Sequence, residues 1–153
     1  MIILQRQATK VAYIVDGDNG GEQLRKKLTK AGVPEDLIVD LSHICEDAKE
    51  VEDFVDKSVY ANAVNEELKR SGIQSEIEID MVADQARSNN LKEWCKDRNI
   101  SPPNKAKIAY RILEQSIERE ISDKSKRGSL RQIYDNLKEI FKKESDVSSW
   151  LGR

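Results

Sequence analysis

Residues that mark secreted, membrane-bound or zinc-binding proteins are scarce in this chain. Its two cysteines, Cys45 and Cys95, lie far apart and fit neither a zinc nor a redox motif, so we expect reduced thiols and a cytoplasmic location. No segment approaches the roughly twenty apolar residues of a membrane span, and the N-terminus lacks the apolar core of a signal peptide. We therefore expect no membrane partner. The only histidine, His43, argues against a histidine-rich metal site and against a Ser-His-Asp triad.

A strong net charge of one sign is also missing. The net charge is −2, although 35% of the residues are charged. A nucleic-acid partner would therefore have to be held by a local basic patch, by metal ions or by another part of a larger protein. The length of 153 residues fits one domain with a core of its own.

The N-terminal third of the chain predicts a strand, a helix and a second strand. The apolar run VAYIV at 11–15 predicts a strand buried on both faces, and the glycines of the DGDNGG that follows permit a sharp turn. Residues 22–31 carry leucines four apart, with an acid first and cations later, which predicts a short helix closed by Gly32. LIVDL at 37–41 predicts a second buried strand. Together they predict a βαβ unit with parallel strands.

The rest of the chain is mainly helical in pattern. Apolar spacing and capping residues predict four further helices, at about 56–70, around Trp94, after Asn104 as N-cap, and at 130–143. The segment 73–84 is compatible with a strand or with the start of a helix.

The polar stretch at 123–129 is the best linker candidate. We therefore divide the chain into an α/β domain at 1–122 and a linker with an amphipathic helix at 123–153. The expected fold class is a small parallel, Rossmann-like sheet flanked by helices, with a helical C-terminal region.

Two aspartates stand at the predicted end of the first strand. Asp16 and Asp18 fall where open α/β sheets bind their ligands, at the carboxyl end of a strand. Carboxylates two residues apart can converge on one hard cation, and ligation by oxygen alone suits Mg²⁺ or Mn²⁺. The alternative is a plain turn, because Asp, Asn and Gly are also common turn residues.

A second acidic cluster follows the second predicted strand. Glu50, Glu52 and Asp53 would come near the first pair, because adjacent parallel strands end at the same edge of a sheet. The alternative is that these acids stabilise the N-terminus of the helix at 56–70 without any metal. For Glu50 we prefer this capping role.

The order of these motifs resembles a known family. An apolar strand ending in DGD, a helix, the strand LIVDL and then VEDFVDKSVYANAVNEEL are similar to the catalytic Toprim domain, most of all to that of OLD-type (overcoming lysogenization defect) nucleases. The resemblance implies that Asp16 and Asp18 bind divalent metal, and that Glu52 and Asp53 form the later acidic pair.

A late lysine belongs to the same resemblance, which covers about residues 8–115. In these nucleases a lysine at the start of a late helix handles phosphate, which implies a catalytic role for Lys105, with Lys107 as the alternative. The implied activity is cleavage of nucleic acid, DNA rather than RNA, with Mg²⁺ or Mn²⁺ as cofactor. The implied partner is the ATPase domain of the parent protein.

One family element has no counterpart in the sequence. Toprim domains begin with a strand ending in a glutamate that serves as general acid or base, yet none of the fifteen residues before Asp16 is acidic. We therefore expect the chain to correspond to the back portion of a Toprim domain. Because general acid–base groups typically supply about 10²–10⁴-fold in rate, we expect metal binding with weak or no nuclease activity.

Two other functions are compatible with the residues. NYN-type ribonucleases of the PIN superfamily begin with a strand similar to VAYIVDGDN, and would use Asp16 and Asp18 with a later acid, Asp80 or Asp84. A non-enzymatic interaction module would instead dock onto a partner or onto a second copy of the chain, through the amphipathic helix at 130–141.

Overall fold

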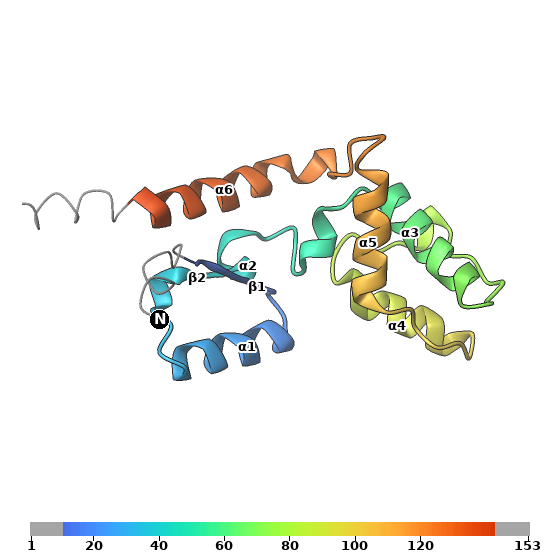
Figure 1. The fold of residues 1–153 in the computed structure, drawn as a ribbon, viewed down its shortest axis with the longest axis horizontal. Helices are drawn as coiled ribbons and strands as arrows, with labels where there is room; N and C mark the ends of the chain where they lie inside the picture. The colour runs from blue at the N-terminus through green and yellow to red at the C-terminus, as the bar shows by residue number, and fades with distance from the viewer. Residues whose placement is uncertain (1–10, 143–153) are drawn as a thin grey trace, which may run out of the picture.

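The computed structural model describes residues 11–142 as an α/β protein with a small parallel sheet flanked by helices (Figure 1). Strand β1 (Tyr13–Val15) pairs in parallel with β2 (Ile38–Asp40), and Val15 lies opposite Asp40. Helix α1 (Asn19–Lys30) connects the two strands. The predicted βαβ unit is therefore confirmed.

The strands are less buried than their apolar sequences predicted. Val15 and Val39 are buried, but Ile14 is 42% exposed. A sheet of two strands is covered by neighbouring elements over only part of its surface, so an apolar run here does not imply burial on both faces. The prediction of a fully buried first strand was wrong.

Helix α1 begins earlier than predicted because the glycines lie inside it. The carboxylate of Asp18 accepts a hydrogen bond from the backbone N–H of Gly21 at 2.8 Å and caps the helix. A Cβ atom on Gly21 would lie 2.6 Å from the carbonyl carbon of Asp16, so only glycine fits where the helix passes the strand end. At the other end, Gly32 has a positive φ of 89° and closes the helix as predicted.

Three helices form a second region of the molecule. They are α3 (Lys57–Arg70), α4 (Arg87–Asp97) and α5 (Lys105–Gln115), close to the predicted positions. Asp56 caps α3 and Asn104 caps α5, each through its side-chain oxygen. The helices enclose the larger hydrophobic core, whose members include Val64, Leu68, Trp94, Ile108 and Ile112.

The segment left open between strand and helix forms neither. Residues 73–86 run without regular structure apart from a short 3₁₀ turn at Ile79–Met81. The side chain of Asn65 replaces a partner strand, because it accepts from the N–H of Ile77 at 2.8 Å and donates to the same residue's carbonyl at 3.0 Å.

Helix α6 (Arg127–Lys142) passes over the sheet on the side opposite α1 (Figure 1). Its residue Ile133 completes a smaller core with Leu41, Cys45, Ala48 and Phe54, and the short helix α2 (Leu41–Ile44) belongs to this cluster. No helix in the described part of the chain is long and apolar enough to cross a bilayer.

Residues 123–129, predicted as a linker, form a structured segment that packs against other loops. It forms a 3₁₀ turn (Lys124–Lys126) that runs directly into α6. Lys126 is buried, and its ammonium donates to the backbone carbonyls of Asp47, at 2.7 Å, and of Asp84. A charged sequence predicts solvent exposure, but here the backbone carbonyls of two loops satisfy the buried ammonium. Cys45 and Cys95 are both buried and free.

Candidate functional site

The carboxyl end of β1 is held against the loop that follows β2 and α2. The N–H of Gly17 donates to the carbonyl of Lys49 at 2.6 Å, and the N–H of Val51 donates to the carboxylate of Asp16 at 3.2 Å. A Cβ on Gly17 would lie 2.9 Å from the Cβ of Ser42, so glycine also lets the end of β1 pass close to α2. The two acidic segments therefore meet, as the parallel pairing of the strands predicted.

Lys105 joins the two acidic segments. Its ammonium lies 3.0 Å from Oε1 of Glu52 and 3.8 Å from Oδ2 of Asp16. The lysine comes from the first turn of α5, whose N-cap Asn104 fixes the start of the helix. Lys107, the alternative, turns to Glu67 at 3.2 Å, so of the two lysines only Lys105 reaches the acids.

The charges of this cluster shift the pKa values of its members. Burial raises the pKa of the Asp16 carboxyl, while the charge of Lys105 and the N–H of Val51 oppose the rise. For Lys105, burial acts to lower the pKa, but the hydrogen bond and charge of Glu52, with the charge of Asp16, outweigh it. The net pKa of Lys105 is raised, so the ammonium stays protonated between the carboxylates.

Glu52 has one carboxylate oxygen that is free to accept a further ligand. Its atom Oε1 binds Lys105, but Oε2 is buried and has no hydrogen-bond partner. A buried carboxylate oxygen without a partner costs free energy, so a bound group would relieve it. A cation suits this oxygen, and the acids nearby offer only oxygen ligands.

The carboxylates do not form a ready-made cluster around one point. Across residues 11–142, no group of three or more His, Cys, Asp or Glu side chains is arranged to hold a metal ion. The ammonium of Lys105 lies between the carboxylates of Asp16 and Glu52, where it neutralises part of their charge. The residue types fit Mg²⁺ or Mn²⁺, and binding would require the side chains to rearrange.

Asp53 does not join this site. It is fully buried, and its carboxylate accepts hydrogen bonds from the backbone N–H groups of Lys49, Glu50, Ala86 and Arg87 at 2.8–3.2 Å. These four hydrogen bonds saturate the carboxylate. They hold the acidic loop, residues 49–53, against the start of α4. The expected metal-binding role for Asp53 is therefore replaced by a structural one, and we take it out of the ligand set.

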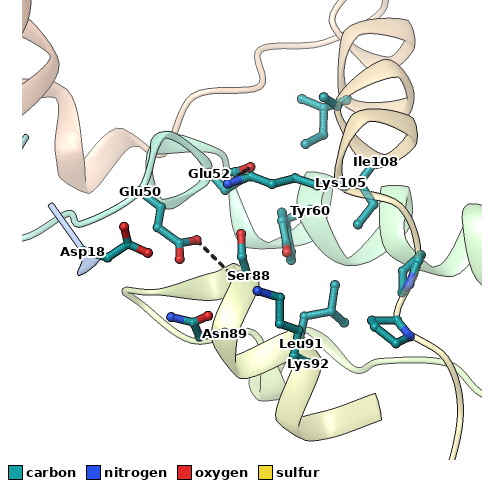
Figure 2. Close-up of a pocket in the computed structure, with 14 residues that line it drawn as sticks. Asp18, Glu50, Glu52, Tyr60, Ser88, Asn89, Leu91, Lys92, Lys105 and Ile108 are labelled. Carbon is teal, nitrogen blue, oxygen red and sulfur yellow. Dashed lines mark hydrogen bonds and ion pairs between the residues drawn. The ribbon is translucent and has the colours of Figure 1, made fainter. Parts of the chain in front are cut away.

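Glu50 has the capping role that we expected, but at a different helix. It is only 2% exposed, and its Oε2 accepts from the N–H of Ser88 at 2.9 Å (Figure 2). It thus binds the first turn of α4, whereas the expected helix, α3, is capped by Asp56. Ser88 is far from Glu50 in sequence, so no local pattern signals this contact.

Two hollows meet at the cluster. The inner pocket, about 280 Å³, lies among α3, α4 and α5 and includes Glu50 and Tyr60 in its lining (Figure 2). The outer groove, about 450 Å³, runs along β1 and α1. Asp18, Glu52 and Lys105 line both, so they form the passage between the two.

The acids expected for the ribonuclease alternative lie elsewhere. Asp84 is exposed and pairs with Lys57 at 2.7 Å, and neither Asp80 nor Asp84 lines the inner pocket or the outer groove. The structure therefore brings Asp16, Asp18, Glu50, Glu52 and Lys105 together, without a contribution from the segment at 73–86.

Comparison with family models, with curated proteins and with solved structures found no significant match for this chain. Its function must therefore be inferred from the geometry of the site.

Proposed function

We propose that this chain binds Mg²⁺ or Mn²⁺ at the carboxyl end of β1 and uses it to hold a nucleic-acid phosphate, as part of a Toprim-like nuclease. The single observation that carries the proposal is the convergence of acids from two loops with Lys105, beside a buried Glu52 oxygen that has no partner. DNA is the expected nucleic acid, and the ATPase domain of a parent protein is the expected partner.

The proposed roles follow from position. Asp18 and Glu52, which line both hollows, would supply oxygen ligands together with Asp16 from the outer groove and Glu50 from the inner pocket. A bound cation would stabilise charge on the phosphoryl group and lower the pKa of a bound water. Lys105 would bind a phosphate oxygen in the same passage, with a charge that its raised pKa keeps in place.

Cleavage by these residues alone is expected to be slow. The acids that line the two hollows, Asp16, Asp18, Glu50 and Glu52, are all assigned here as metal ligands, so none of them is left to serve as a general acid or base. Such a group typically contributes about 10²–10⁴-fold in rate. Binding of metal and of nucleic acid is therefore a better measure of this function than turnover.

Calorimetric titration with Mn²⁺ tests the metal site. We expect saturable binding by the wild-type chain and at least about tenfold weaker binding by Asp16→Asn and Glu52→Gln, because each loses a charged ligand. Glu78→Gln, an exposed acid away from the site, is the matched control and should bind as wild type does. Absence of binding by wild type, or binding unchanged in Glu52→Gln, would contradict the proposal.

Lys105→Gln should change the affinities for Mn²⁺ and for DNA in opposite directions. The ammonium competes with a cation for the carboxylates of Asp16 and Glu52, so its removal should strengthen Mn²⁺ binding. The same variant should bind DNA more weakly, because it lacks the charge proposed to hold phosphate. A lysine that only stabilises the fold would not separate these two affinities.

A non-enzymatic interaction module is the second candidate. Tyr110 and Leu113 on α5 and Ile117 in the turn that follows it are 68%, 58% and 85% exposed. Apolar side chains in such a row are common on surfaces that bind other proteins. If the wild-type chain binds neither Mn²⁺ nor DNA, this function takes precedence.

A further inference from the structure

The inner pocket changes character along its length. Its mouth is charged, with Glu52 and Lys105 (Figure 2). The rest of its lining on α4, on α5 and on the loop between them includes the cation Lys92 but is mostly apolar: Leu91, Pro102, Pro103, Ile108, Ala109 and Ile112. A ligand that fits both ends has a charged group joined to an apolar or flat one.

The size of the pocket limits that ligand. Its volume of about 280 Å³ lies just below the roughly 300–1,000 Å³ typical of pockets for drug-sized molecules. One ring system attached to a charged group fits such a volume, whereas paired and stacked bases do not. A base must leave its stack to enter a pocket of this kind.

The lining contains polar groups able to hydrogen-bond to the edge of a base. Oγ of Ser88 is buried and has no hydrogen-bond partner. The amide of Asn89 lies beside it in the lining, and Tyr60 contributes a nearly buried aromatic ring. Single-stranded nucleic acids are recognised by this combination of apolar or aromatic surfaces with hydrogen bonds to the base edges.

We propose that the inner pocket binds the unstacked base of a nucleotide whose phosphate lies at Lys105 in the pocket mouth. The preferred substrate is then a single strand or a strand end, not a continuous duplex. This inference rests on the proposed function, because it places the phosphate at the same cluster. The ligand expected in the inner pocket is a nucleoside phosphate, either free or within a strand.

Fluorescence anisotropy with a labelled oligothymidylate, in Mn²⁺, tests the inference. We expect the wild-type chain to bind the single strand about tenfold more tightly than a duplex of the same sequence. Ala109→Leu extends an exposed lining residue into the pocket and should weaken single-strand binding about tenfold, within the range that stacking of one base supplies. Ala106→Leu, on the same helix but outside the lining, should change nothing.

Competition separates the two sources of the ligand. Thymidine monophosphate that displaces the strand, where inorganic phosphate does not, indicates that the free nucleotide suffices. Displacement by neither supports recognition of the base within a strand, provided that Ala109→Leu weakens binding. Asn89→Ala, a second exposed variant, should weaken single-strand binding while leaving the Mn²⁺ affinity unchanged.

The outcomes distinguish failure of the base pocket from failure of the metal site. If Mn²⁺ binds but single strand and duplex bind equally well, or Ala109→Leu has no effect, the base pocket is refuted and the metal site stands. Equal competition by inorganic phosphate and thymidine monophosphate also refutes it. If the wild-type chain binds neither Mn²⁺ nor any oligonucleotide, both proposals fall.

Discussion

The sheet region of this molecule (β1, β2, α1, α2, α6 and the loop after α2) and its helical region (α3 to α5) differ in the size of their hydrophobic cores. The helical region, α3 to α5, encloses a core of thirteen buried residues, whereas the core shared by α2, α6 and the acidic loop has five. Since burial of apolar surface is the main source of stability, most of it lies in the helical region. The acids lie on the loops of the sheet region, so the proposed carboxylate ligands are carried by the part with less intrinsic stability.

The site depends on contact between the two regions. The sheet region supplies Asp16, Asp18, Glu50 and Glu52, and the helical region supplies Lys105 and the apolar wall of the inner pocket. The acidic loop is bound to α4 through Asp53 and Arg87. The guanidinium of Arg87 is buried and donates to the carbonyls of Ala83, at 2.9 Å, Glu52, at 3.0 Å, and Val55.

Loss of this connection should have the largest effect on stability. Asp53→Ala removes the acceptor of four backbone N–H groups, each of which costs about 1–3 kcal/mol when buried without a partner. We expect a loss of at least about 4 kcal/mol, measured by urea denaturation. Glu52→Gln changes the residue immediately before Asp53 and is the control. If both variants are equally stable, Asp53 does not join the regions.

Truncation of one core side chain in each region should have the next-largest effect on stability, and the effect should differ between the two regions. Leu68→Ala in the larger core should cost about 3 kcal/mol, within the range for buried leucines. Ile133→Ala in the smaller core should cost less and should increase hydrogen exchange in α6 more than in α3. A larger loss for Ile133→Ala would reverse the assignment of stability made above.

The cap of α3 should have the smallest effect. Asp56→Ala should cost about 1 kcal/mol near pH 7, with Glu66→Ala on the exposed face of the same helix as control. The hydroxyl of Ser58 is the main cause that lowers the pKa of Asp56 in the fold. A lowered carboxyl pKa stabilises the fold above the unfolded value of about 3.9, and that contribution disappears as the pH falls through the folded pKa.

The difference between wild type and Asp56→Ala should therefore shrink when the pH is lowered below about 4. Chemical denaturation at a series of pH values measures it. A difference that stays constant down to pH 2 would show that the negative charge of Asp56 does not contribute to the stability of α3.

The sequence predicted the local elements because they rest on local rules. The βαβ unit followed from an apolar run, a short amphipathic helix and Gly32, and the later helices followed from apolar spacing and from the cap Asn104. Strand burial failed as a prediction, since the exposure of Ile14 depends on how few strands the sheet has.

Within the site, neighbouring acids took different roles for reasons that no local pattern contains. Glu52 and Asp53 are adjacent, yet one faces the hollows and the other binds the backbone of α4. Glu50 and the buried Lys126 were likewise assigned by residue type, whereas their partners come from distant segments. Which acid meets which backbone is a property of tertiary structure.

The glycine at position 21 has a consequence for recognising relatives of this chain. Helix α1 passes so close to the carbonyl of Asp16 that any side chain at Gly21 would displace the end of β1, and the acids with it. Homologues that keep this geometry should therefore carry glycine five positions after the first aspartate, even where the surrounding sequence has diverged. That spacing offers a search pattern more specific to this fold than the acidic pair alone.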